Sequence, residues 1–420
     1  MRILIATPYL PWPLNSGGNA AQFSTLKCLA EDHEFTVVSL VYNREQMAYV
    51  KELSVHLPNV KWRGVYCGEE PLSPSLPFRI LRRLVREGQK WLRRSASTAK
   101  LPDYPFQPVP EPLLAVLQEE LDLSPDLCQV EFAPLMSLGT WLPKRVPKLF
   151  IHHQLHFVYT DRFLEANGNN PYVDYLAGMM RVQELACLQH FDAIVTFSDE
   201  DKRALASVLP AAKVFTSPFP IPADVGITDN IPEHFDGRFL LVASEVHPPN
   251  QDALDWLLAE IWPKIIAQLP AARLVVVGKW NAATIKAKSS ASVSFTGFVH
   301  DLGSTLRGGI MLVPVRIGSG LRTKILIALA QGVPVVSTTV GSEGLLVQDG
   351  QELLKRAGAS EFAAASVELA RQPDLWHRLA IAGHAAAVEH YSPEGVRRRR
   401  NEIYAAMVEE NCKKTMEVLS

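Results

Sequence analysis

The sequence predicts an α/β protein made of two Rossmann-like domains, whose parallel sheets face a central cleft. Three observations support this fold class. The chain has 420 residues, which is enough for two domains of roughly 200 residues each. Both halves open with the order strand, loop, helix, strand, at 2–40 and 238–277. A proline-rich stretch at 217–232 separates the halves, as a stiff linker does.

Composition and charge exclude several functional classes. The 42 basic and 44 acidic residues give a net charge of −2, which is no nucleic-acid signature. The five cysteines show no C-x-x-C spacing, which argues against a zinc site or a disulfide framework and favours a reducing cytoplasm. The first apolar run stops at Pro8, too early for a signal peptide, and no run approaches the length of a bilayer span. We therefore expect a cytoplasmic protein.

In the first half, residues 2–7 have the pattern of a buried strand, and the prolines after them require a loop. Gly17 and Gly18 come next, before a helix at 20–31 and a strand at 35–40. A glycine loop in this place lies at the ligand-binding edge of a doubly wound sheet. The G-x-G-x-x-G dinucleotide fingerprint is absent, and a plain tight turn is the alternative interpretation.

A strongly basic segment follows at 78–94. Apolar residues recur there at helical spacing among seven basic residues and a single acid, Glu87. A basic amphipathic helix that carries Trp and Phe is typical of an element at a membrane surface. The alternative is a helix that docks on the core by its apolar stripe and leaves its basic face in water.

Further strands are expected at 127–132, 147–151 and 192–198, and three histidines in five residues follow the second of them. His152, His153 and His156 could converge on a metal only if this segment were helical. No carboxylate stands at a diagnostic spacing, so we expect no metal site. For His153 alone, a turn histidine with no ligand role is the alternative to a binding role.

The second half begins with a predicted strand at 238–243, a helix at 251–266 and a strand at 273–277. The last of these ends at Gly278 and Lys279, where the lysine could hold a diphosphate or could simply be solvated. Another strand is expected at 293–298.

The most informative stretch is 310–337. A short apolar run at 310–315 predicts a buried strand, and Gly318 and Gly320 allow a tight turn and a close approach to a ligand. An apolar stripe beginning at Leu321 predicts a helix of about three turns, with Gly332 at its C-cap.

Positive charge gathers where this helix begins. A helix that starts after a glycine turn offers free N–H groups to an anion. Arg316, Arg322 and Lys324 add full charges at the same end. The stretch therefore predicts a seat for a phosphate or diphosphate, and the alternative is an ordinary strand–helix crossover with solvated cations.

The segment P-V-R-I-G-S-G-L-R-T-K-I-L-I-A-L-A-Q-G-V-P-V-V-S-T at 314–338 resembles the donor-binding segment of retaining glycosyltransferases with the GT-B fold, especially family 4. Two further matches are T-G-F-V-H-D at 296–301 and G-S-E-G-L at 341–345. The resemblance implies a GT-B fold and transfer of a sugar from a UDP- or GDP-sugar with retained anomeric configuration. It implies neither a cofactor nor a catalytic metal.

The resemblance also assigns roles to matching residues. His153 would lie near the donor sugar and diphosphate, while Arg322 or Lys324 would stabilise the leaving diphosphate, so these three are the catalytic candidates. Glu343 is the best acidic candidate for accepting hydrogen bonds from sugar hydroxyls. The full set of donor-binding candidates is Gly17, Gly18, Lys279, Phe298, Val299, Gly318, Ser319, Gly320, Leu321 and Glu343.

Two positions depart from the family pattern. In the E-x7-E motif of family 4, the second glutamate usually binds the nucleotide ribose, and it falls here at Ile327, which cannot do so. Losing one charged hydrogen bond would cost roughly 1.5–3 kcal/mol. Ala243 stands where relatives carry a glycine. A degenerate GT-B protein that binds or scaffolds another transferase is therefore the alternative function.

The predicted organisation is an acceptor-side domain at 1–216, a linker at 217–236 and a donor-binding domain at 237–392, with 393–420 crossing back onto the first domain. The expected partners are a nucleotide sugar and a glycan or polyprenyl-linked acceptor in surface polysaccharide or glycolipid synthesis, and no nucleic acid. Segment 78–94 would hold the enzyme, a hexosyltransferase in type, peripherally on the anionic inner face of a membrane.

Overall fold

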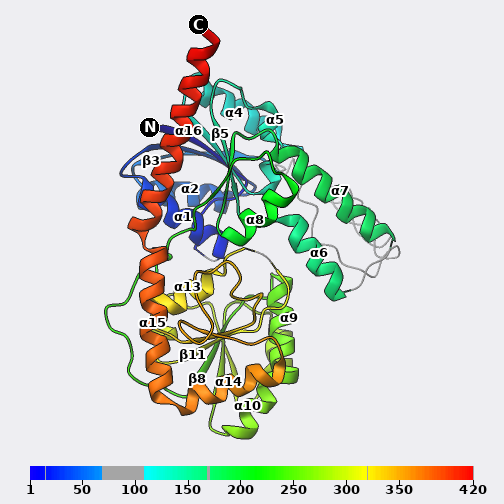
Figure 1. The fold of residues 1–420 in the computed structure, drawn as a ribbon, viewed down its shortest axis with the longest axis vertical. Coiled ribbons are helices and arrows are strands. Elements are labelled where there is room, and N and C mark those ends of the chain that lie inside the picture. The colour runs from blue at the N-terminus through cyan, green and yellow to red at the C-terminus, as the bar shows by residue number, and fades with distance from the viewer. Residues whose placement is uncertain (15, 69–107, 168–170, 319, 420) are drawn as a thin grey trace, which may run out of the picture.

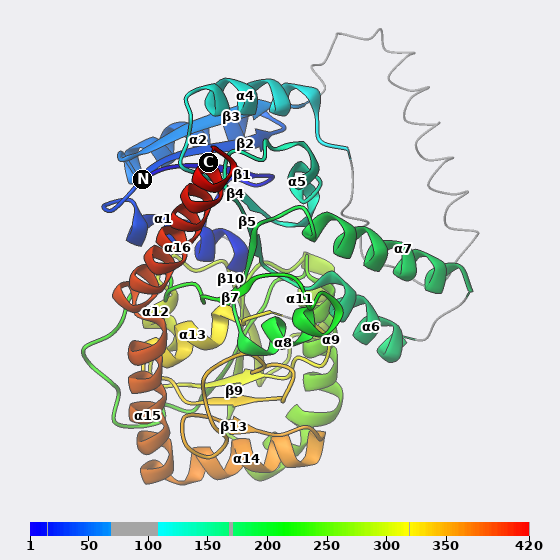
Figure 2. The same cartoon turned by 45° about the horizontal axis from the view of Figure 1, so that its top comes forward.

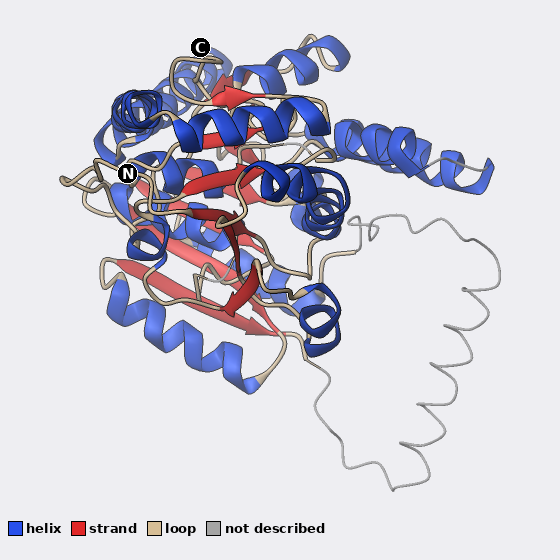
Figure 3. Cartoon of the chain, turned by 90° about the horizontal axis from the view of Figure 1, so that it is seen from below, coloured by secondary structure: helices blue, strands red, loops and turns tan. Residues whose placement is uncertain are grey.

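The computed structural model describes residues 1–14, 16–68, 108–167, 171–318 and 320–419. Two parallel sheets, one from each half of the chain, lie one above the other along the long axis of the molecule (Figure 1). Helices cover both faces of the strands (Figure 3). The predicted fold class is confirmed. The basic segment 78–94 and Ser319 lie outside the described residues.

Within the described residues, the first sheet has seven strands in the order β3-β2-β1-β4-β5-β6-β7. Its strands are β1 Arg2–Thr7, β2 Glu34–Val41, β3 Val60–Tyr66, β4 Leu127–Glu131, β5 Lys148–His152, β6 Ala193–Thr196 and β7 Val214–Thr216. Ile3 and Ile5 of β1 are fully buried, since this strand lies near the middle of the sheet with neighbours on both sides.

In the part of the chain that the structure describes, the second sheet has six strands in the order β10-β9-β8-β11-β12-β13. Its strands are β8 Arg238–Val242, β9 Arg273–Val277, β10 Val293–Gly297, β11 Ile310–Val313, β12 Val335–Ser337 and β13 Leu354–Lys355. In both sheets the order reverses beside the first strand, which is the arrangement that places ligands outside the carboxyl ends of the strands.

Helices connect most of the strands as crossovers, and the last three helices follow the last strand. Those of the first half are α1 Gly17–Leu29, α2 Arg44–His56, α4 Glu111–Asp122, α5 Leu138–Trp141, α6 His156–Asn167, α7 Pro171–Leu188 and α8 Asp199–Val208. Those of the second half are α9 Pro248–Trp256, α10 Trp262–Gln268, α11 Ala282–Lys288, α12 Leu302–Leu306, α13 Thr323–Ala330, α14 Ala359–Arg371, α15 Pro373–Tyr391 and α16 Pro393–Leu419. The helix predicted at 251–266 contains a π-turn at Leu257–Ile261. In the described ranges, none of the helices combines the length and hydropathy that crossing a bilayer requires.

The carboxyl edge of the first sheet meets the second half of the chain. A Cβ built on Gly17, the first residue of α1 after β1, would lie 2.9 Å from Thr323 Oγ1 at the start of α13. After β5, the carbonyl oxygen of His153 would lie 2.8 Å from a Cβ built on Gly320. Because all seven strands are parallel, these loops leave from one edge of the sheet.

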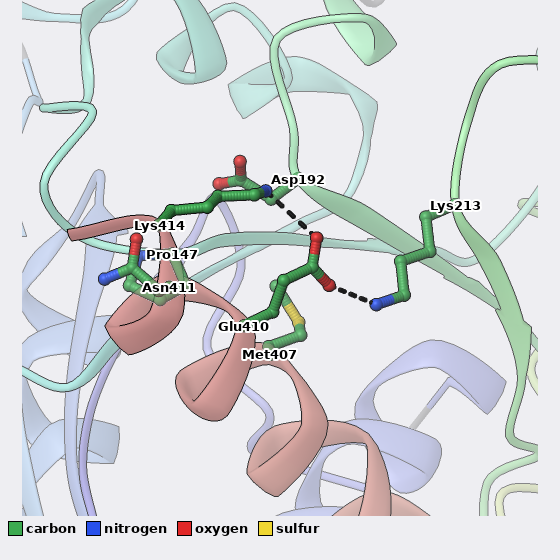
Figure 4. Close-up of a pocket in the computed structure, with 7 residues that line it drawn as sticks. All are labelled: Pro147, Asp192, Lys213, Met407, Glu410, Asn411 and Lys414. Carbon is green, nitrogen blue, oxygen red and sulfur yellow. Dashed lines mark hydrogen bonds and ion pairs between the residues drawn. The ribbon is translucent and has the colours of Figure 1, made fainter. Parts of the chain in front are cut away.

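The last two helices run along one side of the molecule (Figure 1), with α15 against the second sheet's half and α16 against the first. Tyr404 of α16 is fully buried, and its hydroxyl donates to Gln129 Oε1 of β4 at 2.7 Å. Further along α16, Glu410 bonds Lys213 at 2.5 Å and Lys414 at 3.0 Å (Figure 4). These two bonds lower the pKa of Glu410 to about 2.

Candidate functional site

The site begins with the glycine turn between β11 and α13. Gly318 has a φ of +141° and Gly320 a φ of +78°, which are conformations that favour glycine. A Cβ on Gly320 would also lie 2.8 Å from the carbonyl oxygen of His153. Leu321 is buried in the core and anchors the turn. The backbone bend that the two glycines predict is therefore present, and at Gly320 it contacts the backbone of the first domain at His153.

Two cations stand at the start of α13. Arg322 Nη1 donates to the carbonyl of Gly320 at 2.6 Å, and burial lowers the Arg322 pKa to about 10 although the carboxylates of Glu343 and Asp201 oppose the shift. Lys324 Nζ donates to Asn250 Oδ1 at 3.0 Å. Burial, and secondly the charge of Arg322, lower the Lys324 pKa to about 7. Both side chains thus occupy a weakly solvated place where an anion would be strongly attracted.

An ion pair crosses between the domains at this point. Arg162 of α6 donates to both carboxylate oxygens of Glu343, at 2.5 and 2.7 Å, and to the carbonyl of Gly318 at 2.7 Å. The Arg162 and Glu343 side chains are only 28% and 30% exposed. The hydrogen bond to Glu343 raises the pKa of Arg162. Glu343, predicted to accept bonds from a sugar, is therefore held by an arginine in this state.

His153 is held from two directions. Its ring stacks on Phe132, with centroids 3.7 Å apart and an interplanar angle of 13°, and its Nε2 donates to Glu131 Oε2 at 2.9 Å. Phe132 has a φ of +64°, which is rare for a large side chain and marks local backbone strain. Glu131 also accepts a bond from Gln129 Nε2 at 2.7 Å. The imidazole is therefore held in one orientation by Phe132 and Glu131, while the backbone carbonyl of His153 lies beside Gly320.

The three histidines do not converge. His152 Nε2 lies 3.0 Å from Glu184 Oε1, and both side chains are almost fully buried, whereas His153 bonds Glu131. Glu184 also accepts the backbone N–H of His156 at 2.9 Å. Among the residues that the structure describes, no group of three or more His, Cys, Asp or Glu side chains could hold a metal ion.

Gly17 and Gly18 form the first turn of α1, which Ser16 caps by accepting the N–H of Asn19. Gly17 lies against Thr323, as described above, and a Cβ on Gly18 would lie 3.5 Å from the ring of Phe132. The two glycines therefore lie between the start of α13 and the Phe132 ring, on which the His153 ring stacks.

Lys279, Phe298 and Val299 lie at the ends of β9 and β10. Lys279 Nζ stands 5.6 Å above the Phe298 ring, which is 49% exposed, and Val299 is partly buried. Ala243 is close-packed here: its carbonyl accepts the indole N–H of Trp280 at 2.9 Å, and a Cβ on Gly278 would lie 2.0 Å from the same oxygen. An exposed aromatic ring beside a lysine is a suitable surface for a nucleotide base.

Arg316 differs from expectation, whereas Ile327 lies in the apolar stripe as expected. Arg316 does not join Arg322 and Lys324, because its guanidinium bonds both carboxylate oxygens of Asp252, at 2.5 and 3.1 Å, and lies 5.0 Å above the Trp256 ring. Ile327 is 7% exposed and packs in the apolar core. The position at which the family resemblance would place a ribose-binding glutamate is thus part of the apolar core.

Several site residues did not emerge as candidates from the sequence. The fold brings Arg162 to Glu343, Asn250 to Lys324 and Asp201 close to Arg322. Phe132 and Glu131 follow one another at the end of β4, and a carboxylate at the end of a buried parallel strand was the one signal that could have pointed to them.

Solved structures with this architecture are numerous and cover almost the whole chain. TarM of S. aureus, as a variant in complex with fondaparinux, alpha-GlcNAc-glycerol and UDP, superposes with a TM-score of 0.67 at 12% identity, covering 96% of this chain and 99% of that one. Anabaena HepE in complex with UDP gives a TM-score of 0.63 at 13% identity, covering 97% of this chain and 100% of that one. The chain has the GT-B fold.

Sequence comparison adds two findings on this GT-B protein. Residues 237–372, which contain the glycine turn and α13, match the family model described as Glycosyl transferases group 1. Over 409 residues the chain is 20% identical to an uncharacterized 44.6 kDa protein in the cps region of Klebsiella pneumoniae, covering 94% of this chain and 97% of the relative.

Proposed function

We propose that this GT-B protein is a glycosyltransferase that moves a sugar from a nucleoside diphosphate sugar to a glycan or lipid-linked acceptor. The observation that carries the proposal is the pair of buried cations, Arg322 and Lys324, beside a glycine turn at the start of α13, with Arg322 near Asp201 of the first domain. The group 1 match over 237–372 supports it, as do the UDP complexes of TarM and HepE.

The proposed chemistry follows from where negative charge develops. When the bond between the sugar and the diphosphate breaks, its electron pair stays on the departing phosphate oxygen. Arg322, Lys324 and the backbone N–H groups of the turn would stabilise that charge in a place already arranged for it. His153, fixed by Glu131 and Phe132, would hydrogen-bond the sugar or the leaving oxygen.

The finer parts of the proposal rest on the family resemblance. They are a UDP or GDP donor, a hexosyl group transferred with retained configuration, and no catalytic metal. They also include a polyprenyl-linked or glycan acceptor in surface polysaccharide synthesis at the inner membrane face. The Klebsiella relative in a cps region supports the polysaccharide setting. Glu343 would be released from Arg162 to receive the donor's hydroxyls.

Calorimetric titration with UDP-glucose, UDP-N-acetylglucosamine and GDP-mannose, each with and without EDTA, tests the proposal. We expect at least one donor to bind and to be slowly hydrolysed by the isolated protein. Arg322→Met should weaken that binding at least tenfold, or about 1.4 kcal/mol. Arg316→Met is the matched control, because Arg316 pairs with Asp252 instead. Absence of binding by every donor would refute the proposal, and binding without turnover would favour the degenerate scaffold.

A further inference from the structure

A row of aromatic side chains follows the carboxyl edge of the first sheet, one for each of four neighbouring strands. Tyr66 ends β3, Tyr42 follows β2, Tyr9 follows β1 and Phe132 follows β4, and the sheet order is β3-β2-β1-β4 (Figure 2). Neighbouring strands lie about 4.8 Å apart, so the four positions span about 15 Å. This is the length scale of a short oligosaccharide rather than of one small ligand.

The row is continuous with the candidate donor site. The Tyr9 and Phe132 rings meet edge to face, with centroids 5.2 Å apart and an angle of 81°. Phe132 in turn stacks on His153, whose carbonyl lies against Gly320 of the glycine turn. Anything lying on Tyr9 and Tyr42 therefore has one end directed at the atoms that the proposed reaction uses.

The outer part of the row is also close-set. Tyr42 carbonyl oxygen and Tyr66 hydroxyl oxygen border the same small space beside Gly68, at 2.4 and 2.5 Å from the position of a Cβ there. The Tyr42 pKa is raised mainly by burial of its hydroxyl, and the neighbouring Cys67 and Tyr9 add to the shift. The Tyr66 hydroxyl thus lies near the backbone of Tyr42, and Tyr42 is a neighbour of Tyr9.

The tyrosine rings are nevertheless open to water. Tyr9 is 49% exposed, Tyr42 50% and Tyr66 39%. A ring that served only to fill the core would be covered by other side chains. Each tyrosine offers an apolar face together with a hydroxyl that can donate and accept hydrogen bonds. A pyranose ring has the complementary surface, with C–H bonds on its faces and hydroxyls around its rim.

We propose that Tyr9, Tyr42 and Tyr66 form a stacking platform for the pyranose rings of a saccharide acceptor, which extends past Phe132 to the donor turn. This inference rests on the proposed function and specifies the class of its acceptor. A prenyl chain offers no hydroxyls for hydrogen bonds and would leave apolar surface in water on such an open row. The chemistry of the platform therefore favours sugar rings.

Saturation-transfer NMR on the full chain with UDP present tests the platform. The probes are chitotetraose, cellotetraose, maltotetraose and mannotetraose, with farnesyl phosphate as the lipid arm. We expect at least one tetrasaccharide to receive saturation from the wild-type protein. Tyr9→Ala and Tyr42→Ala should each reduce that signal at least fivefold. Tyr9→Phe, which keeps the ring, should retain most of it.

Tyr175→Ala is the matched control, because Tyr175 is 60% exposed but lies on α7, away from the row. UDP affinity and circular dichroism are recorded for each variant, and both should match the wild type. The platform is overturned if UDP binds normally while no tetrasaccharide is saturated, if both alanine variants keep the full signal, or if farnesyl phosphate alone depends on these tyrosines. Failure of the proposed function is a different result, in which neither UDP nor any nucleotide sugar binds.

Discussion

Lys324 should make the affinity for a nucleotide sugar fall as the pH rises above neutrality. In the free protein its pKa is lowered to about 7 by burial and by Arg322, so the ammonium loses its proton near neutral pH. A bound diphosphate would bring negative charge next to it and return its pKa toward the ordinary value of about 10.4. Binding would therefore take up a proton at any pH between these two values.

The sign and size of the effect follow from this shift. The affinity for the nucleotide sugar is highest below pH 7, where Lys324 is already charged in the free protein. It declines about tenfold for each pH unit above 7. Between pH 6 and pH 8.5 the decline is about 30-fold, or about 2 kcal/mol. By the same linkage, Lys324 makes the free energy of unfolding rise with pH above 7, because the unfolded chain then holds a proton that the folded chain has released.

Calorimetry with the best-binding UDP-sugar from pH 6 to 8.5 measures the profile, and its phosphates stay ionised throughout this range. Lys324→Met should bind weakly and without this slope. Lys279→Met should bind less well but keep the slope, because it leaves Lys324 in place. A wild-type profile that changes less than threefold, or a slope that persists in Lys324→Met, would show that Lys324 does not meet the phosphates.

Three further outcomes are expected. Gly278→Ala should lower the melting temperature by several degrees more than Gly297→Ala, because both positions have positive φ but only the first Cβ would meet a backbone oxygen, at 2.0 Å. Arg162→Met and Glu343→Gln should each raise the radius of gyration measured by X-ray scattering without ligand, since they break an interdomain ion pair, and an unchanged radius in both would contradict this role. Glu131→Gln should lower the transfer rate about tenfold or more with little change in donor affinity, and an equal loss of both would mean that Glu131 only supports the fold.

The fold could be predicted because its signals are local. Apolar runs of strand length, turn glycines and helical stripes each fall within a few residues, and the turn at Gly318 and Gly320 was placed correctly between β11 and α13 for that reason. The alternation of side chains along a strand, another local signal, explains why neighbouring histidines at the end of β5 have different partners. Consecutive residues point to opposite faces, so His152 meets Glu184 while His153 meets Glu131.

The site's partners could not be predicted because they are distant in the sequence. Arg162 and Glu343 are 181 residues apart, and Arg316 and Asp252 are 64 apart. A charge count at the start of α13 cannot tell which arginine finds a carboxylate on a neighbouring helix. Arg316 therefore looked equivalent to Arg322 in the sequence, although only Arg322 faces the other domain.

The contact between α16 and β4 affects the order in which the protein can mature on the ribosome. Tyr404 bonds Gln129, which bonds Glu131, which positions His153, and Arg400 is buried with them against the first domain. The amino-terminal half emerges first, yet the helix that completes its hydrophobic interior is translated after everything in the other half. Until α16 has been synthesised, this apolar surface of the first domain is exposed on the nascent chain. Transiently exposed apolar surface of this kind favours aggregation and chaperone binding.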